Sequence, residues 1–157
     1  MMANPLAGSR FYARLGNFFT RPAWTWLSPP KGFGVLTTIG RKSGRTRSQS
    51  IRAIREGQRI VVVAMMGERA QWLKNTRSDP RVTIKLSDGT LEGIARGVVD
   101  DREREWAAAI YADTVVANDR FDYVAYEWRF PTKRKIIEAH KRWFEEGVPV
   151  IIETGGS

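Results

Sequence analysis

The sequence has 157 residues, of which 42% are hydrophobic and 11% aromatic, a composition typical of one folded domain. It contains no cysteine, which excludes disulfides, thiolate metal sites and cysteine nucleophiles. One histidine, His140, leaves little basis for a metal site, and we expect none. The 26 Lys and Arg exceed the 17 Asp and Glu, which gives a net charge of +9.

The positive charge is concentrated in the first part of the chain. Residues 1–60 hold 11 of the 26 Lys and Arg, with Glu56 as their only acid, whereas the remaining 15 are matched by 16 acids. This asymmetry indicates a polyanionic partner for residues 1–60. A nucleic acid, an anionic membrane surface and a phosphorylated small molecule all fit.

Residues 1–30 combine this charge with aromatic side chains, and we expect an amphipathic helix over Ser9–Phe19 followed by an aromatic, basic segment. The residues that carry this pattern are Phe11, Leu15, Phe18, Phe19, Trp24 and Trp26. The segment either packs against the domain or lies in an anionic membrane interface. No stretch reaches the ~20 apolar residues of a membrane span, and no signal peptide is recognisable. We therefore expect a cytoplasmic protein, either free or peripheral at the inner face of the cell membrane.

The rest of the chain alternates strand and helix patterns. Apolar residues at helical spacing cover Glu68–Arg77, a segment after Asp100-Asp101, and Thr132–Glu146, where His140 is expected to be structural. Residues 119–130 are ambiguous between the two patterns. Predicted strands are Val35–Ile39, Ser48–Arg55, Arg59–Met65, Arg81–Leu86, Thr90–Val99 and Val148–Glu153. This order predicts a single α+β domain, 1–157, with a small antiparallel β-barrel and helices outside it.

A short basic loop, Gly40–Arg47, lies between two of the predicted strands. It places Arg41, Lys42, Arg45 and Arg47 beside two glycines, so guanidinium groups and backbone N–H groups can surround an anion. It is not a Walker loop, because a strand rather than a helix follows it. On composition alone, a solvated basic turn is the simpler interpretation.

The residues around this loop resemble one known family. The order is Leu36-Thr37-Thr38-Ile39-Gly40-Arg41-Lys42-Ser43-Gly44-x-x-Arg47, then Val61-Val62-Val63-Ala64, then Trp72-x-x-Asn75 before Asp79-Pro80. With this order, residues 33–99 resemble the deazaflavin-dependent nitroreductases, split-barrel oxidoreductases that use coenzyme F-420. Val148–Glu153 is similar to their closing strand. The resemblance implies a split β-barrel of the FMN-binding type, with a cofactor-binding core at 33–99, a helical substrate-side region at 100–147 and a closing strand at 148–153.

The resemblance also implies roles for individual residues. Coenzyme F-420 ends in a phospholactyl group and a polyglutamate tail, to which a cationic loop is complementary. The implied cofactor-binding residues are Arg41, Lys42, Ser43, Gly44 and Arg47 at the tail, Val35, Leu36 and Thr37 along the groove, and Ala64, Met65, Met66, Trp72 and Asn75 around the ring.

The implied reaction is hydride transfer from reduced F-420 to a small lipophilic acceptor: a quinone, an enone or a nitroaromatic. Water or a tyrosine can supply the proton, and Tyr111, Tyr123 and Tyr126 lie in the region that covers the substrate in relatives. Nitroreducing relatives often carry a tyrosine, in the strand after the basic loop, where this chain has Arg52. Arg52 either contacts the acceptor, which favours enones, quinones or carboxylates, or points to solvent.

Three alternatives stay open at this point. A split-barrel relative that binds lipids or fatty acids at a membrane shares the fold, and FMN is an alternative to F-420 in the same groove. A nucleic-acid-binding barrel explains the basic loop through phosphate contacts. It does not explain the Trp72-x-x-Asn75 helix or the end of the charge excess near residue 60, so we expect no nucleic-acid partner. A monomer and a homodimer both fit.

Overall fold

The computed structural model describes residues 28–116, 119–120, 123, 130 and 132–155. Almost all of the predicted N-terminal segment 1–30, and Tyr126, therefore lie outside the described residues. The strands are β1 (Phe33–Ile39), β2 (Thr46–Arg52), β3 (Ile54–Glu56), β4 (Arg59–Ala64), β5 (Arg81–Leu86), β6 (Gly89–Gly97) and β7 (Val148–Thr154). The helices are the 3-10 turn η1 (Gly67–Arg69), α2 (Gln71–Ser78), α3 (Asp101–Asp113) and α5 (Lys133–Glu146).

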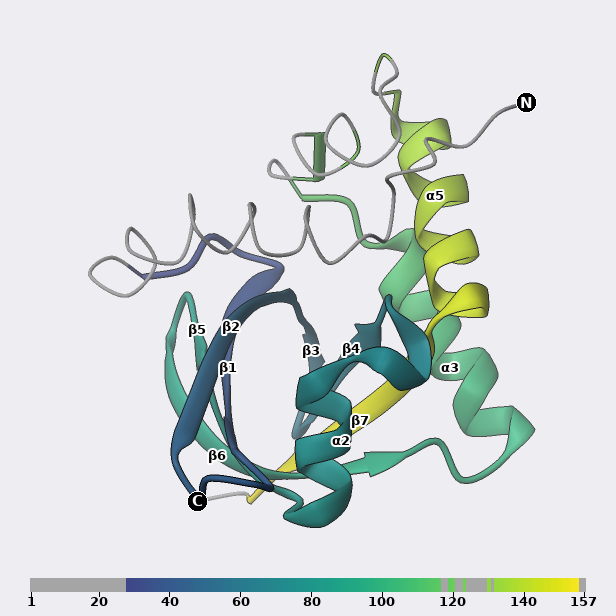
Figure 1. The fold of residues 1–157 in the computed structure, drawn as a ribbon. Helices are drawn as coiled ribbons and strands as arrows, with labels where there is room; N and C mark the ends of the chain where they lie inside the picture. Colours follow the sequence, from purple (N-terminus) through teal and green to yellow (C-terminus); the bar gives the residue numbers. More distant parts are fainter. Residues whose placement is uncertain (1–27, 117–118, 121–122, 124–129, 131, 156–157) are drawn as a thin grey trace.

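The described strands form one sheet in the order β2-β1-β5-β6-β7-β4-β3, and all neighbouring strands are antiparallel. The sheet curls into a half-barrel with the helices around it (Figure 1). The last strand, β7, lies between β6 and β4, so Ile151 is opposite Val61 on one side and Arg96 on the other. The α+β split-barrel expectation is confirmed.

After Arg59, strand β4 is apolar as far as Ala64 because both of its faces are buried. Ile60 and Val62 belong to the core inside the curled sheet, together with Trp72 and Leu73 of α2. Val61 and Val63 point to the opposite face, where they pack in a second core with Tyr111 of α3 and Phe144 of α5. A strand buried on both faces has a continuous apolar sequence rather than an alternating one.

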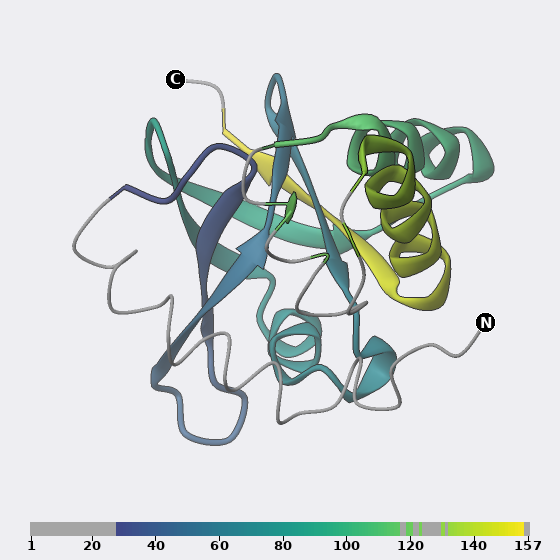
Figure 2. The same ribbon diagram turned by 90° about the horizontal axis from the view of Figure 1, so that it is seen from above.

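The helices divide between the two faces of the sheet. Seen from above, α3 and α5 lie side by side beyond β4 and β7, whereas α2 is set apart near the loop that joins β1 to β2 (Figure 2). Each long helix begins at a side-chain cap: Asp100 accepts from the N–H of Glu103, and Thr132 accepts from the N–H of Lys135. Among the described residues, no helix is long and apolar enough to cross a membrane.

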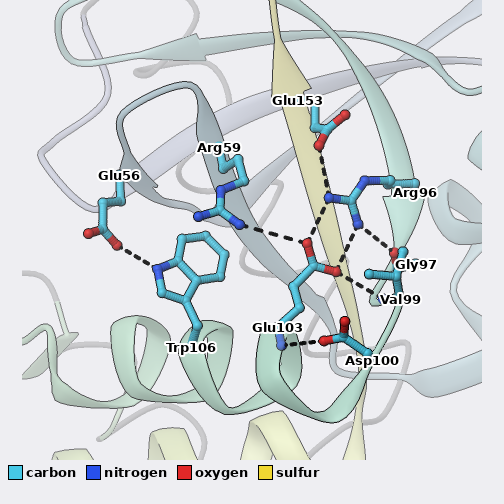
Figure 3. A network of polar contacts seen from close by, with 9 residues as sticks. All are labelled: Glu56, Arg59, Arg96, Gly97, Val99, Asp100, Glu103, Trp106 and Glu153. Atoms are coloured by element: carbon cyan, nitrogen blue, oxygen red, sulfur yellow. Dashed lines mark hydrogen bonds and ion pairs between the residues drawn. The ribbon is translucent and has the colours of Figure 1, made fainter.

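A network of charged side chains joins α3 to the sheet (Figure 3). Glu103 accepts two hydrogen bonds from Arg96 of β6, at 2.9 and 2.7 Å, and one from the backbone of Val99 at 2.9 Å. Arg96 also donates to Glu153 of β7 at 2.8 Å. The hydrogen bonds from Arg96 lower the pKa of Glu103 to about 2. This carboxylate therefore stays ionised while it connects α3 with β6 and, through Arg96, with β7.

The next turn of α3 is held to β4 and β3 by Trp106, which is drawn in the same view (Figure 3). The guanidinium of Arg59 lies 3.8 Å from the centre of the indole ring, a cation–π arrangement. The indole Nε1 donates to Glu56 at 3.0 Å. Together with Glu103, Trp106 fixes α3 against the outer face of the sheet.

Two predicted boundaries are wrong. The predicted strand Ser48–Arg55 is two strands, because the chain bends at Ala53, whose N–H donates to the carbonyl of Gly32 at 2.9 Å. The predicted helix Glu68–Arg77 begins only at Gln71, because Ala70 has an extended backbone (φ −63°, ψ 123°) and separates α2 from the η1 turn. The other elements predicted within the described residues occur where expected, within two residues or so at each end, and the predicted helix Ser9–Phe19 lies outside the described residues.

Candidate functional site

A groove of about 500 Å³ opens between α2, the loop after β1 and the beginning of β2. The lining side chains are polar or basic apart from Trp72, and none of them is acidic. The lining residues are Thr38, Gly40, Arg41, Lys42, Ser43, Arg47, Ser48, Gln49, Gln71, Trp72 and Asn75. The shape and charge of the groove suit a ligand with an anionic part and a planar or apolar part.

The basic loop is folded by its own backbone. The N–H of Gly40 donates to the carbonyl of Arg45, and the N–H of Gly44 donates to the carbonyl of Gly40, both at 2.8 Å. Gly44 has φ +68°, a conformation that side chains with a Cβ seldom adopt. A Cβ on Gly40 would lie 2.9 Å from Oγ of Ser43. The two glycines thus allow a compact loop in which successive cations project outward.

Arg41 differs from the other loop cations because α2 holds it in place. Oδ1 of Asn75 accepts from the backbone N–H of Arg41 at 3.3 Å and from its Nη1 at 3.0 Å. Nη2 of Arg41 donates to Oε1 of Gln71 at 3.0 Å. The Asn75 amide, which is 5% exposed, also donates to Oγ1 of Thr38 at 3.1 Å. One side of the groove is thereby preorganised before any ligand binds.

The other three cations of the loop are exposed. Within the described part of the chain, no hydrogen bond or ion pair involves the side chains of Lys42, Arg45 or Arg47. Three exposed cations in six residues, without a neighbouring acid in the lining, create a region of positive potential. Their donors are available to the oxygens of a phosphate or a carboxylate.

The groove contains six of the residues that the resemblance assigned to the cofactor: Arg41, Lys42, Ser43, Arg47, Trp72 and Asn75. Gly44 shapes the same loop. Leu36 and Ala64 lie in the core with no exposure, and Val35 is nearly buried. Oγ1 of Thr37 forms a hydrogen bond with Oγ of Ser48 at 2.7 Å. Met65 and Met66 pack against two different core clusters at the end of β4.

Sequence reasoning missed several lining residues. Thr38 and Gly40 were inside the quoted motif without a role of their own, and Gln71 directly precedes Trp72. Ser48 and Gln49 continue the groove along β2 after Arg47. The run of polar residues in Thr46–Arg52, interrupted only by Ile51, was an available signal, because a strand that lines a polar groove lacks an apolar face there.

The candidate substrate-side residues lie in a separate, buried region. Arg52 is 6% exposed, so the solvent-facing alternative is wrong, and it is not part of the groove lining. Tyr111 and Tyr123 are 1% and 4% exposed. Arg52 forms an ion pair with Asp119 at 2.7 Å, and its guanidinium carbon lies 5.0 Å from the ring centre of Tyr111.

His140 belongs to the same buried region, as expected for a structural histidine. Its Nδ1 is 3.2 Å from the carbonyl of Ala112, and Nε2 has no hydrogen-bond partner among the described residues. Burial, reinforced by the charge of Arg52, lowers the pKa of His140 to about 4. The ring is therefore neutral at neutral pH, with Nδ1–H as the donor.

A comparison with protein families identifies the family of this chain. The model of the F-420H(2)-dependent quinone reductase family matches residues 26–134, a span that includes the whole groove. The chain belongs to this family. The family is described as F-420H(2)-dependent, and its matched span contains the basic loop and α2 together.

Solved structures agree with this family at the level of the fold. An F-420-H2 dependent reductase, FDR-A, is 19% identical over 80% of this chain and 97% of its own, with a TM-score of 0.52. A protein described as a domain-swapped dimer is 19% identical over 89% and 97%, with a TM-score of 0.55. HutZ from Vibrio cholerae, described as a haem storage protein, is 15% identical over 81% and 84%, with a TM-score of 0.51. At these identities the shared property is the split barrel.

Proposed function

We propose that this member of the family binds reduced coenzyme F-420 in the basic groove and passes hydride to a lipophilic acceptor, with a quinone as the first candidate. The observation that carries the proposal is the division of the loop cations into one held by α2 and three that have no partner among the described residues. A long polyanionic tail needs several cations in a row. The groove beside the loop offers Trp72 as an apolar wall for a ring.

The residues present fit the cofactor in both charge and shape. Lys42 and Arg47 would bind the phosphate and carboxylate oxygens of the tail, and Arg41 would add a guanidinium of fixed orientation. Trp72, which is almost completely buried, would limit how deeply the ring enters. When bound, the reduced deazaflavin supplies the hydride. The protein contributes binding, orientation and exclusion of water.

The proton that accompanies the hydride needs a donor near the acceptor. Tyr123 and Tyr126 stay our candidates, with solvent water as the alternative. Tyr111 is packed between His140 and Phe144, with ring centres at 5.9 and 6.0 Å, which favours a structural role for it. Arg52 has its donors directed at Asp119 and at backbone carbonyls, so we propose no direct contact with the acceptor.

Haem binding, the property for which HutZ is described, has less support in this chain. The sequence has one histidine and no cysteine, the usual strong ligands of haem iron. His140 has no exposed surface and is not among the residues that line the groove. A haem in this groove would lack an imidazole ligand. Related split barrels bind FMN, but FMN carries a single phosphate, which would engage fewer of the loop cations.

Equilibrium titration of the purified protein with F-420, FMN and haem tests the proposal directly. We expect a Kd for F-420 in the micromolar range or lower, about −8 kcal/mol or better, and weaker binding of the other two. Oxidation of reduced F-420 is then followed by absorbance with menadione, an enone and a nitroaromatic as acceptors. Tighter binding of FMN or haem than of F-420 would overturn the cofactor assignment.

A further inference from the structure

A buried ionic cluster, formed by Arg52, Asp119 and His140, joins β2 to the helical side of the molecule. Asp119 and His140 have no exposed surface, and Arg52 is 6% exposed. Nη1 of Arg52 donates to Oδ1 of Asp119 at 2.7 Å. Buried ions of this kind are costly to leave unpaired, so both partners depend on the contact. Burial raises the pKa of Asp119, and the nearby charge of Arg52 opposes that rise.

The same arginine closes the C-terminal end of α3. Its Nη2 donates to the carbonyls of Tyr111 at 2.9 Å and Thr114 at 2.5 Å. Nδ1 of His140 donates to the carbonyl of Ala112, which belongs to the same end of the helix. The last carbonyls of a helix have no partners within it, and a cation there is favourable. Side chains from β2 and α5 therefore fix where α3 ends.

Asp119 uses its second oxygen to fix the chain that follows α3. Oδ2 accepts from the N–H of Val116 at 2.7 Å, and the N–H of Asp119 donates to the carbonyl of Val116 at 3.0 Å. Val116 and Asp119, the two ends of a short turn, are thus bonded to each other, and the turn is attached to β2 through the guanidinium of Arg52. A Cβ on Gly32 would lie 2.8 Å from Val116, so the turn also contacts the chain just before β1.

This turn is connected to the groove through two methionines. Tyr123, four residues after Asp119, belongs to a cluster with Ile136 and Trp143 against which Met65 packs. The next residue, Met66, packs against the core that contains Trp72, the apolar wall of the groove. A shift of the turn therefore bears first on the Tyr123 cluster and Met65, and it reaches the groove wall only indirectly, through Met66.

We infer that Arg52 is a positioning residue, which through its ion pair with Asp119 fixes the turn that leads to Tyr123 and so shapes the surroundings of Tyr123, near which the proposed function places the acceptor. The inference rests on the proposed function for the identity of the acceptor. It assigns to Arg52 a role that neither direct acceptor contact nor solvent exposure describes. The tail-binding cations are not involved, so cofactor affinity and acceptor affinity should respond differently to its loss.

Three variants test the inference: Arg52→Met, Arg52→Lys and Asp119→Asn. Arg52→Lys keeps the positive charge but can donate to fewer hydrogen-bond acceptors. Asp119→Asn keeps the shape of the side chain but not its charge. The matched control is Arg55→Met on β3, where an arginine makes an exposed ion pair with Asp88 at 3.4 Å. Two readouts apply to the folded proteins. Native-state trypsin cleavage after the exposed Arg120 reports on the turn, and steady-state kinetics with menadione plus the Kd of F-420 report on the groove.

We expect Arg52→Met and Asp119→Asn to speed cleavage after Arg120 at least tenfold and to raise the menadione KM at least fivefold. The Kd of F-420 should stay within twofold of the wild type. Arg52→Lys should be intermediate, and Arg55→Met should match the wild type. If Arg52→Met does not fold, the other two variants carry the test.

The inference is overturned if cleavage is unchanged, if cleavage rises but KM does not, or if KM and the F-420 Kd rise together. A wild-type protein that does not bind F-420 would refute the proposed function instead. In that case faster cleavage in the variants would still support the attachment of the turn by Arg52, and unchanged cleavage would refute it.

Discussion

Asn75 accepts two hydrogen bonds from Arg41, one from the backbone N–H at 3.3 Å and one from Nη1 at 3.0 Å. The two residues are 34 positions apart, on α2 and on the loop after β1. Because the same amide donates to Thr38, this one side chain links the helix, the loop and the strand that enclose the groove.

Loss of the Asn75 amide should therefore weaken cofactor binding without removing a loop cation. In Asn75→Ala, Arg41 would lose its fixed orientation, and ordering it again on binding costs roughly 0.5–1.5 kcal/mol, or about 2- to 10-fold in Kd. Asn75→Asp should bind more weakly still, because a carboxylate in the groove repels the anionic tail. Fluorescence titration with F-420 measures both, and binding as tight as in the wild type would contradict the role of Asn75.

The unpartnered cations should account for the salt dependence of binding. Lys42→Ala and Arg47→Ala should each weaken F-420 binding by about 1.5–3 kcal/mol, roughly 10- to 100-fold, because each removes a charge-assisted hydrogen bond. The dependence of Kd on salt concentration should become shallower in the double variant. Arg102→Ala, an exposed arginine on α3, is the matched control. A double variant that binds like the wild type would rule out the groove as the tail site.

The groove could be predicted from the sequence because its signals are local. The basic loop and the Trp72-x-x-Asn75 pattern each lie within eight residues, and their order along the chain pointed to a known family. The hydrogen bonds between Arg41 and Asn75 were not predictable, since nothing in either segment specifies that α2 packs beside the loop. Composition described the four loop cations as equivalent, whereas one of them is bonded to protein.

The burial of Arg52 could not be predicted from the sequence, for a different reason. It ends a strand whose other residues are exposed or half-buried, so the pattern indicated an exposed or groove-facing side chain. Its partner Asp119 is 67 residues away and falls in 119–130, which has no helical or strand period. A buried charge is recognisable only with its counter-charge, and here the counter-charge lies in the least patterned part of the chain.

The Glu103 network should contribute measurably to stability. Glu103→Gln removes the charge that accepts from Arg96 and should lower the free energy of unfolding at pH 7 by about 1–3 kcal/mol. The pKa of Glu103 is lowered from 4.5 to about 2, so its stabilising effect is present above pH 4.5 and is lost as the pH falls toward 2. Urea unfolding at pH 7 and pH 3 should give a smaller difference between wild type and variant at pH 3. An equal difference would contradict the ion-pair explanation.

The N-terminal segment should determine membrane binding. We propose that residues 1–30, which contain no acid, bring the enzyme to anionic bilayers, with up to ~1 kcal/mol from each basic residue at the surface. Sedimentation with vesicles containing anionic lipid should retain the full chain and not a variant lacking residues 1–30. Neutral vesicles are the control. Equal retention of both proteins would contradict the proposal, and an insoluble truncated protein would indicate that the segment packs against the domain.

His140 should make stability depend on pH between about 6.5 and 4. Its pKa falls from 6.5 to about 4 on folding, so the unfolded chain takes up a proton at pH values where the folded protein does not. The free energy of unfolding therefore decreases as the pH falls through this window, by up to ~3 kcal/mol.

Asp119 works in the opposite direction above pH 3.8, because its raised pKa lets the folded state keep a proton that the unfolded chain has lost. The comparison with His140→Asn separates the two groups, since the amide Nδ2 can replace the Nδ1–H that bonds to Ala112 but does not titrate. Urea unfolding at half-unit steps from pH 7 to pH 4 should show a smaller decrease in the variant. Parallel curves would mean that His140 is protonated in the folded protein, and the neutral ring inferred from its burial would be wrong.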